Sequence, residues 1–583
     1  MVNQELAKIF QRISLYLAMR EVPFKPHAYE RVAFALESLA EDVGAIYKRD
    51  GRKGLAEIPG VGESIAEKIE EYLKTGNIRL YEQEVKRMPV DVEELTSLEG
   101  VGPKMVADLY RKLKIRNLKE LERAARAKRI RKLPRFGEKT ERNILEAIEF
   151  AKRREGRKLL GDIYPFVRDY ELLLKESGLI QQVSPAGSFR RMRETVGDID
   201  LLVTSRDPKK VIAYALSHIP YEKLWGKGET KISLRSTHGF DIDIRVVPRK
   251  SYGSALQYFT GSKEHNIATR RIAIEKGLKL SEYGLFKGKK MIAGQTEEEI
   301  YNAMGLAWIS PEMRENQGEI KLADTRCPQK LPHIIGYQDI KGDLHCHSDW
   351  DGGDHSIEEM AAAAMRMGYE YIGIADHTKA LHIEHGLDEK QLEQRNKEID
   401  NLNSKFEARN SKQIQNPKFK ILKGVEANIL KDGSIDIKDE VLAQMDFVIA
   451  GIHSNMKMDR QKMTERMIKA MRNPNVDIIS HPTGRILKKR DEYQIDFEAF
   501  LKAAKETGTI LEISAWPERL DLNDQNIRRS KEAGVKMIIN TDSHNKNQLH
   551  LMEFGIAQAR RGWAEKEDII NCWPLEKLLK YFK

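Results

Sequence analysis

GSFRRMRETVGDID, residues 187–200, is the stretch that decides the fold of this chain. Its second half continues as VGDIDLLVT, a pattern that predicts a β-strand, and residues two apart on a strand point to the same face. Asp198 and Asp200 should therefore direct their carboxylates to one point. The first half offers Gly187–Ser188, Arg190 and Arg191, whose N–H, hydroxyl and guanidinium groups suit a bound triphosphate.

A third carboxylate is expected on a neighbouring strand. Residues 240–247, FDIDIRVV, alternate cleanly, which places Asp241, Asp243 and Arg245 on one face and the aliphatic side chains on the other. An Asp-x-Asp pair alone is common and usually solvated. Three acids beside a phosphate-binding turn are more specific, because two metal ions held there neutralise the attacking and leaving oxygens of an in-line phosphoryl transfer.

The order of these motifs resembles that of the family X DNA polymerases. The resemblance continues through YFTGS at residues 258–262 and on to Asn266 and Arg270. It implies that Asp198, Asp200 and Asp243 are catalytic and bind two Mg²⁺ or Mn²⁺ ions, with Asp243 also near the primer 3′ oxygen.

The same resemblance implies a nucleotide-binding set. Ser188 and Arg191 would hold the triphosphate, while Tyr258 and Phe259 would flank the sugar, with the Tyr258 region excluding a 2′-hydroxyl. Gly261 belongs to the same nucleotide-binding set. Asn266 would touch the base edge and Arg270 the template side. His265 departs from the family pattern, since animal members carry an aromatic ring at that position.

Composition describes an ordinary intracellular protein with an asymmetric charge. The 583 residues are 40% hydrophobic and 32% charged, with three cysteines and no apolar run of the roughly 20 residues needed to span a bilayer. The start, MVNQELAKIF, is unlike a signal peptide, so we expect a cytoplasmic, nucleoid-associated protein.

The charge is distributed unevenly along the chain. Residues 1–337 carry 61 Lys/Arg and 48 Asp/Glu, a net +13, whereas residues 338–583 carry 38 and 41, a net −3. Residues 101–160 alone hold 20 basic and 8 acidic side chains, which predicts salt-sensitive contact with a phosphate backbone.

Two glycine-rich turns in the N-terminal part resemble helix-hairpin-helix modules. LAEIPGVGESIAEKIEEYLKTG contains Gly60 and Gly62 before an amphipathic helix, and LTSLEGVGPKMVADLYRKL repeats the pattern with Gly100, Gly102 and Lys104. A degenerate third copy has Gly137 before its helix. Such a turn presents helix N-terminal N–H groups to a DNA phosphate without reading sequence.

Lys68 lies where the Schiff-base lysine of lyase-active family X members is found, with Tyr29 and Lys25 at flanking positions. Ser64 stands where a second phosphate-binding lysine would be expected. Deoxyribose-phosphate lyase activity is therefore an open expectation, and it requires that the surroundings lower the pKa of the amine.

From residue 338 the pattern changes to seven strands that alternate with helices such as residues 356–367 and 496–506. Six of the seven strands end in His or acidic residues, as a βα-barrel with its site at the strand C-terminal ends requires. The set is His345, His347, Asp351, His377, Glu426, His453, His481, Asp542 and His544. Such nitrogen-rich ligation suits zinc, manganese or iron rather than magnesium alone.

This array resembles the polymerase-and-histidinol-phosphatase (PHP) domain, with all nine expected ligand positions filled. The resemblance implies up to three Mn²⁺ or Zn²⁺ ions, one of which lowers the pKa of an attacking water. It also implies phosphoester hydrolysis, as a 3′–5′ exonuclease with 3′-phosphatase or abasic-site cleavage as further expectations. Arg485, in HPTGR, is the candidate phosphate contact.

We therefore predict a multidomain chain with N-terminal all-α helix-hairpin-helix domains, an α/β nucleotidyltransferase palm and thumb, and a C-terminal (β/α)7-type PHP barrel. The expected boundaries are 1–85 (lyase-like helical domain), 86–155 (helical DNA-binding subdomain), 156–250 (palm), 251–318 (thumb), 319–337 (linker) and 338–583 (PHP phosphoesterase).

The predicted function is gap-filling DNA polymerisation in base excision repair, with DNA ends trimmed by the barrel. The expected partners are gapped or nicked DNA and deoxynucleoside triphosphates, with no membrane, and the expected state is a monomer. Two alternatives stay open at this point: a template-independent nucleotidyltransferase, and a catalytically silent scaffold that binds DNA ends.

Overall fold

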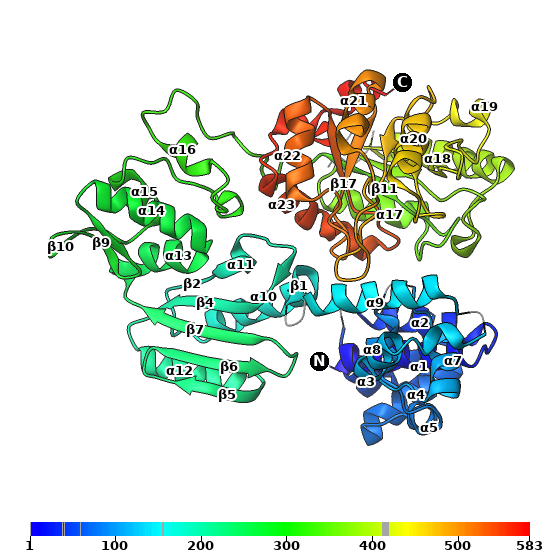
Figure 1. Cartoon of the computed structure of the whole chain (residues 1–583), viewed down its shortest axis with the longest axis horizontal. Coiled ribbons are helices and arrows are strands. Elements are labelled where there is room, and N and C mark those ends of the chain that lie inside the picture. The colour runs from blue at the N-terminus through cyan, green and yellow to red at the C-terminus, as the bar shows by residue number, and fades with distance from the viewer. Residues whose placement is uncertain are drawn as a thin grey trace. The chain divides into compact units, whose positions relative to one another are not determined.

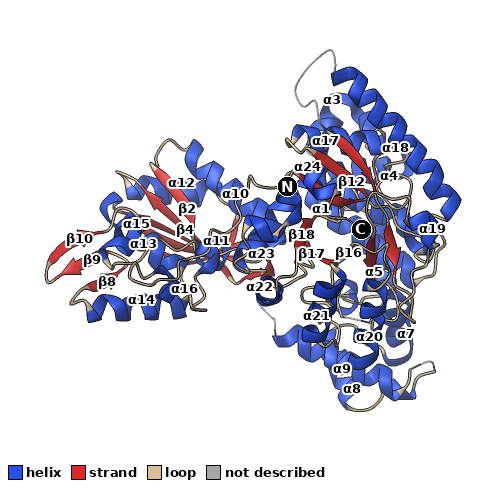
Figure 2. Cartoon of the chain, turned by 90° about the horizontal axis from the view of Figure 1, so that it is seen from above, coloured by secondary structure: helices blue, strands red, loops and turns tan. Residues whose placement is uncertain are grey.

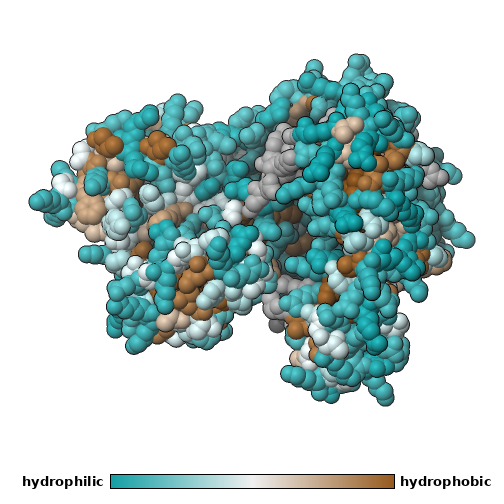
Figure 3. All heavy atoms as spheres, turned by 60° about the horizontal axis from the view of Figure 1, so that its bottom comes forward, coloured by the Kyte–Doolittle hydropathy of each residue, from teal (hydrophilic) through white to brown (hydrophobic). Residues whose placement is uncertain are grey.

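The computed structural model describes residues 2–37, 39, 41–58, 60–98, 100–134, 136–153, 157–410 and 419–582. The chain divides into two compact units, residues 1–155 with 488–490, and residues 156–487 with 491–583. The surface seen in Figure 3 is mostly hydrophilic, with apolar patches scattered over it. Among the described helices, none combines the length and the apolar character that crossing a membrane requires.

In the first unit, the secondary structure of the described residues between 2 and 153 is helical (blue and cyan in Figure 1). Its two turns at Gly60 and Gly100 both have φ of +78°, a left-handed backbone that glycine adopts without the cost of a Cβ. Each turn is followed by an amphipathic helix that buries one face: Ile65 and Ile69 in α4, and Val106 and Leu109 in α7. The helices are α1 (Val2–Met19), α2 (Lys25–Glu37), α3 (Val43–Ala56), α4 (Glu63–Thr75), α5 (Arg79–Arg87), α6 (Val92–Thr96), α7 (Pro103–Leu113), α8 (Leu118–Arg126) and α9 (Glu138–Arg153).

The second unit begins with a five-stranded sheet in the order β2-β4-β7-β6-β5. β4 and β7 are parallel neighbours, and their aliphatic residues face helices α10 and α12 in one core, while their acidic residues lie on the opposite face of the sheet. The elements are β1 (Lys158–Leu159), α10 (Leu160–Glu176), β2 (Gln182–Pro185), α11 (Gly187–Arg190), β3 (Thr195–Val196), β4 (Asp198–Thr204), α12 (Pro208–His218), β5 (Tyr221–Lys227), β6 (Lys231–Ser236) and β7 (Asp241–Val247).

A small α/β segment follows this sheet (green in Figure 1). Its elements are α13 (Tyr252–Thr260), α14 (Lys263–Glu275), β8 (Lys279–Ser281), β9 (Gly284–Lys287), β10 (Lys290–Ala293), α15 (Glu297–Ala303) and α16 (Glu319–Ala323). Helix α16 starts where the sequence suggested a linker, because Ile320 and Ala323 pack into the core of this segment. The segment thus extends further along the chain than residue 318.

The remaining residues form a barrel of parallel strands with helices outside it (Figure 2). Two sheets, β11-β12-β13 and β14-β15-β16-β17-β18, are joined by bridges between His377 and Glu426 and between Cys346 and Ser543. β13 and β14 are two parts of one predicted strand, so the seven predicted strands are present. The strands are β11 (Gly342–Cys346), β12 (Tyr371–Ile374), β13 (Lys420–Lys423), β14 (Glu426–Asn428), β15 (Ile449–Gly451), β16 (Ile478–Ile479), β17 (Ile510–Ser514) and β18 (Met537–Asn540).

The barrel helices cover a continuous aliphatic core. Ser356 caps the start of α17 (Ile357–Arg366) with a capping box to Glu359, and Asp496 caps the start of α21 (Phe497–Thr507) by accepting from the backbone N–H of Ala499. The helices are α17 (Ile357–Arg366), α18 (Glu389–Asn410), α19 (Asp439–Leu442), α20 (Arg460–Met471), α21 (Phe497–Thr507), α22 (Asp524–Ala533), α23 (Met552–Arg561) and α24 (Leu575–Leu579).

Candidate active sites of the palm and the barrel

The three carboxylates predicted to share metal ions lie on adjacent strands. The β4–β7 register places Asp198 opposite Asp241 and Asp200 opposite Asp243. Burial raises the pKa of Asp200 to about 7, and the charges of Asp198 and Asp243 add to the shift. Like charges that face one carboxyl group raise its pKa, because they disfavour its ionised form.

Gly187, in the turn predicted to bind phosphate, lies against one of these acids, Asp200. A Cβ placed there would lie 3.1 Å from Oδ2 of Asp200, and the φ of Gly187 is +62°. The backbone N–H of Ala186 donates to the carbonyl of Asp200 at 2.8 Å, which fixes the start of α11 beside the acids. Ser188 lies in the first turn of α11, directly after Gly187.

The two arginines of this turn are engaged with the protein itself. Arg190 makes a paired contact with Glu297, both N–O distances being 2.8 Å. Arg191 donates to the carbonyl of Thr260 and, at 3.1 Å, to Glu315. Arg190 is thus a structural ion-pair partner, whereas Arg191 keeps the YFTGS turn against the phosphate-binding turn.

The remaining predicted nucleotide residues gather around that turn. Arg245 lies 4.5 Å from the Phe259 ring centre and Arg270 lies 5.7 Å from that of Tyr258. Asn266 donates to the Tyr258 carbonyl at 2.7 Å. Gly261 has φ of +69°, and a Cβ there would meet the Arg191 guanidinium at 3.1 Å.

His265 is fully buried rather than exposed to a nucleotide. Its Nδ1 lies 2.8 Å from Glu319 and its Nε2 lies 2.8 Å from the Tyr301 hydroxyl. The departure from the family pattern at this position thus produces an internal polar contact between α14, α15 and α16.

Sequence reasoning missed one cation at this site. Lys231 of β6 places its Nζ 2.6 Å from Oδ2 of Asp243. The strand alternation of residues 231–236 was the available signal, since it puts Lys231 on the same face as the acids.

The helix-hairpin-helix glycines leave their helix N-termini open. Gly62 and Gly102 are the N-caps of α4 and α7 and have no side-chain cap, and a Cβ at either would meet nothing within 4 Å. Lys104 extends nearby and pairs with Glu21 at 3.2 Å. Backbone N–H groups at such ends suit a phosphate.

The environment of Lys68 has the property that a Schiff-base amine needs. Burial lowers the pKa of Lys68, and the positive charge of Lys25 contributes in the same direction. The amine donates to the hydroxyl of Ser64 at 3.0 Å and to its carbonyl at 2.8 Å. Tyr29 is buried nearby, in the same core as α4.

In the barrel, all nine predicted ligand residues converge. Eight of them, with the neighbouring Asp376, supply donor atoms to overlapping groups of three that lie within 4.8 Å of one another: His347–His377–His544, His345–His347–Asp542, His377–Glu426–His453 and His347–Asp351–Asp376. His481 joins through Glu426, its Nε2 being 3.2 Å from Oε1.

Several of these donor atoms are buried and have no hydrogen-bond partner among the described residues: Nε2 of His345, Nε2 of His347, Nδ1 of His377 and Oε2 of Glu426. Buried polar atoms that face one another without partners fit bound cations. Burial lowers the pKa of His453 and of His544 to about 4, so both imidazoles are neutral and able to ligate at neutral pH.

Of three buried residues that sequence reasoning did not single out, two orient the ligands and the third, Asp376, lies among them. Glu512 lies 2.7 Å from Nδ1 of His345, Asn428 lies 2.8 Å from Nδ1 of His453, and Asp376 joins the Asp351 group. Partners of this kind fix which imidazole nitrogen faces a metal ion. Asp376 directly precedes His377 in the sequence, whereas Glu512 carries no local signal because it lies inside a strand.

Arg485 does not belong to the histidine cluster. Its guanidinium donates to Glu194 at 2.6 Å and to the Leu520 carbonyl, and its side chain is buried. In this structure the guanidinium pairs with the carboxylate of Glu194, and its contact with a substrate phosphate stays a prediction.

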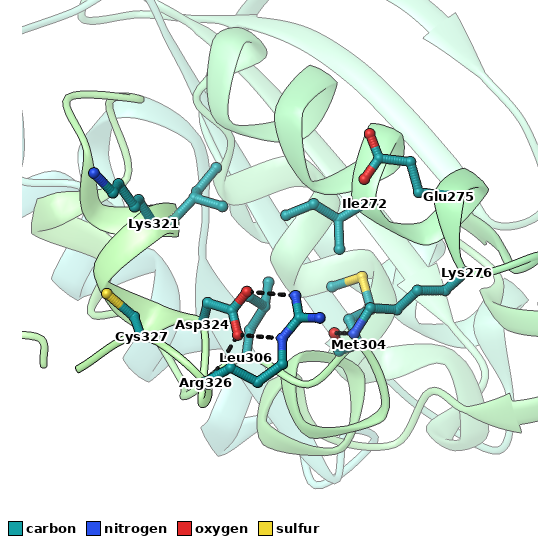
Figure 4. A pocket seen from close by; sticks show the side chains of 10 residues that line it. Ile272, Glu275, Lys276, Met304, Leu306, Lys321, Asp324, Arg326 and Cys327 are labelled. Carbon is teal, nitrogen blue, oxygen red and sulfur yellow. Dashed lines mark hydrogen bonds and ion pairs between the residues drawn. The ribbon is translucent and has the colours of Figure 1, made fainter. Parts of the chain in front are cut away.

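A pocket of about 650 Å³ in the α14–α16 segment contains none of the predicted site residues. Figure 4 shows Lys276 and the Arg326–Asp324 ion pair at its edge, beside Met304 and Cys327. The Lys276 amine donates to the Met304 carbonyl at 2.5 Å.

Comparison with protein families agrees with this arrangement. The matching models are a helix-hairpin-helix domain at residues 1–78, a SAM-like helix-hairpin-helix tandem at 92–149, the DNA polymerase beta thumb at 255–315 and the PHP domain at 343–515. The multidomain fold predicted from the sequence is confirmed.

Of the similar proteins, one aligns with the whole chain and others align with less than half of it. The DNA polymerase/3′-5′ exonuclease PolX of Bacillus subtilis (strain 168) is 35% identical over 588 residues, covering 100% of both chains. A probable phosphatase of Thermoanaerobacter sp. (strain X514) is 28% identical over 41% of this chain and 94% of its own length. DNA polymerase lambda of Rattus norvegicus is 27% identical over 44% of this chain and 48% of its own. The chain belongs to the PolX family, the family X DNA polymerases that carry a C-terminal PHP domain.

Proposed function

We propose that this protein is a DNA-directed DNA polymerase that fills short gaps in base excision repair and carries its own metal-dependent 3′–5′ exonuclease. The polymerase assignment is supported by the register of β4 and β7, which pairs Asp200 with Asp243 and puts Asp198 two residues from Asp200, and by the approach of Gly187 to Asp200. As part of this proposal, the predicted site residues of the palm and of the barrel have the roles that the sequence analysis assigned to them.

The palm acids fit two Mg²⁺ or Mn²⁺ ions, because three carboxylates on one sheet face supply oxygen ligands. When bound, such ions neutralise charge on the phosphoryl oxygens during transfer. The protein contributes orientation: Ser188 and the α11 N–H groups face the triphosphate, and Tyr258 and Phe259 border the sugar.

The barrel provides the hydrolytic site. Six imidazoles and three carboxylates fit up to three ions, and this mixed set suits Mn²⁺ or Zn²⁺. Glu512 and Asn428 hold two of the imidazoles in a ligating orientation. The substrate class is the phosphodiester at a DNA 3′ end.

The first unit supplies DNA binding and, through Lys68, a deoxyribose-phosphate lyase. Gly60, Gly62, Gly100, Gly102 and Lys104 bind the backbone of gapped or nicked DNA. Abasic-site cleavage is assigned to the barrel. The protein works as a monomer at the nucleoid, in the cytoplasm.

The test is a product ladder on singly gapped DNA with Mg²⁺ or Mn²⁺, with and without deoxynucleotides. We expect one-nucleotide extension specified by the template when nucleotides are present, and stepwise 3′ shortening when they are absent. Extension that ignores the template base would instead identify a template-independent transferase. Retained DNA binding without any turnover would identify a silent scaffold.

A further inference from the structure

The edge strand of the palm sheet exposes an indole on the same face as the predicted catalytic acids. Trp225 of β5 is 54% exposed. It lies at a register shift between Leu224 and Gly226, and its Nε1 donates to Oδ1 of Asp241 at 3.1 Å. That hydrogen bond places the ring on the Asp241 face of the sheet.

One cation, Lys223, lies over this ring, and a second, Arg235, contacts the same carboxylate oxygen of Asp241 as the indole does. The register places Lys223 opposite Arg235, and Arg235 opposite Asp241, so all three side chains share one face. The Lys223 amine lies 4.1 Å from the centre of the Trp225 ring, and Arg235 pairs with Asp241 at 3.1 Å. A single exposed aromatic residue is ordinary, but an indole that is hydrogen-bonded in place under one cation and shares its carboxylate partner with another is an ordered surface.

This surface is close to the predicted primer end. Asp241 and Asp243 are two residues apart on β7, which is roughly 7 Å along a strand. The indole, bonded to Asp241, therefore lies about one nucleotide step from the carboxylate assigned to the primer 3′ oxygen.

We propose that Trp225, Lys223 and Arg235 form a binding site for an unpaired DNA nucleotide at the primer 3′ end. The indole face stacks on the base, and the two cations contact its phosphates. Stacking of this kind needs a base whose face is open, and bases inside a duplex are covered by their neighbours. The site thus holds frayed or mispaired ends, which the polymerase cannot extend and an exonuclease removes. This inference rests on the proposed function.

The test measures DNA binding by fluorescence anisotropy in EDTA, so that neither extension nor hydrolysis takes part. One duplex ends in two unpaired 3′ nucleotides and the other is fully paired. We expect Trp225→Ala to weaken binding of the unpaired end at least about fivefold, with the paired end changed less than about twofold. Trp225→Phe should restore most of the loss, because a ring remains.

Leu224→Ala is the matched control, since Leu224 is the neighbouring exposed residue of the same strand and pairs with the buried Leu234. It should leave both affinities within about twofold of the wild type. Hydrolysis of a small phosphodiester by the barrel reports that each variant is folded. Equal weakening of both duplexes, no weakening, or the same loss in Leu224→Ala would overturn the site. Failure of the polymerase assignment would appear separately, as absent extension of paired primers with metal ions.

Lys223→Gln gives an independent readout. Loss of one phosphate contact on a single strand should reduce the slope of log affinity against log salt by about 0.7 for the unpaired end. An unchanged slope would show that Lys223 does not contact a phosphate of the bound DNA.

Discussion

Arg561 of the barrel helix α23 lies 3.2 Å from the carboxylate of Glu315, which also accepts from Arg191 at 3.1 Å. Arg561 is buried, donates to the backbone carbonyl of Arg191 at 3.0 Å and pairs with Asp524. A barrel side chain is therefore part of the support behind the predicted triphosphate-binding turn.

We expect Arg561→Ala to impair extension more than hydrolysis. Glu315 and Asp524 would lose a buried cation, and Arg191 would lose its backbone contact, so KM for deoxynucleotides should rise on the order of 10-fold. Steady-state extension at varied nucleotide concentration checks this, with 3′ hydrolysis as the reference activity. Arg561→Lys should recover part of the loss. A parallel fall in both activities would mean that Arg561 only stabilises the fold.

The two metal sites should be separable by single substitutions. Asp198→Ala should lower extension at least about 100-fold and spare hydrolysis, because several kcal/mol of charge stabilisation are lost only in the palm. His345→Ala should do the reverse. Extension and 3′ shortening measured on one gapped substrate give the comparison. Loss of both activities from either change would contradict two independent sites.

A chelator should be able to remove metal ions from the barrel site and leave those of the palm in place. The nitrogen-rich ligand set of the barrel binds transition metals more tightly than the all-carboxylate palm does. A chelator specific for zinc and manganese, added with excess Mg²⁺, should stop 3′ shortening and leave extension active. Metal analysis of the purified protein checks which ions are lost.

The pKa of Asp200 predicts a pH-dependent stability of the metal-free protein. An acid whose folded pKa is raised to about 7 stays protonated in the folded state while the unfolded chain ionises near pH 4. The free energy of unfolding should therefore fall as pH rises from about 4 to about 7, by at most about 4 kcal/mol.

Asp200→Asn isolates this contribution. The thermal unfolding midpoints of wild type and variant are measured in EDTA. The midpoint of the wild type should fall relative to that of the variant as pH rises over that range, and the difference should then level off. A difference that stays constant between pH 4 and 7 would show that Asp200 ionises normally.

Lys68 should form a covalent adduct with DNA that carries a 5′-deoxyribose phosphate. Its lowered pKa leaves more neutral amine at pH 7 to 8, and borohydride traps the resulting Schiff base. Lys68→Ala should lose most of the trapped adduct, as seen by gel shift. Lys74→Ala is the control on the same helix, since Glu70 raises the pKa of Lys74. If Lys68→Ala trapped as much adduct as the wild type, Lys68 would not be the Schiff-base residue.

Local patterns in the sequence determined much of this protein. Strand alternation put Asp198, Asp200 and Asp243 on one face, glycines marked the two hairpin turns, and ligand residues at strand ends marked the barrel site. These signals have short periods, so a few neighbouring residues suffice to read them.

Contacts between distant segments were decided only by the tertiary structure. Arg485 and Arg190 have the same guanidinium group that a phosphate site needs, and only the positions of Glu194 and Glu297 show that they pair with the protein. Lys231, Glu512 and Trp225 likewise acquire their places from strands paired across the fold. The sequence shows which side-chain groups each segment carries. Which partner each group contacts is decided by the tertiary structure, because those contacts join residues that are far apart along the chain.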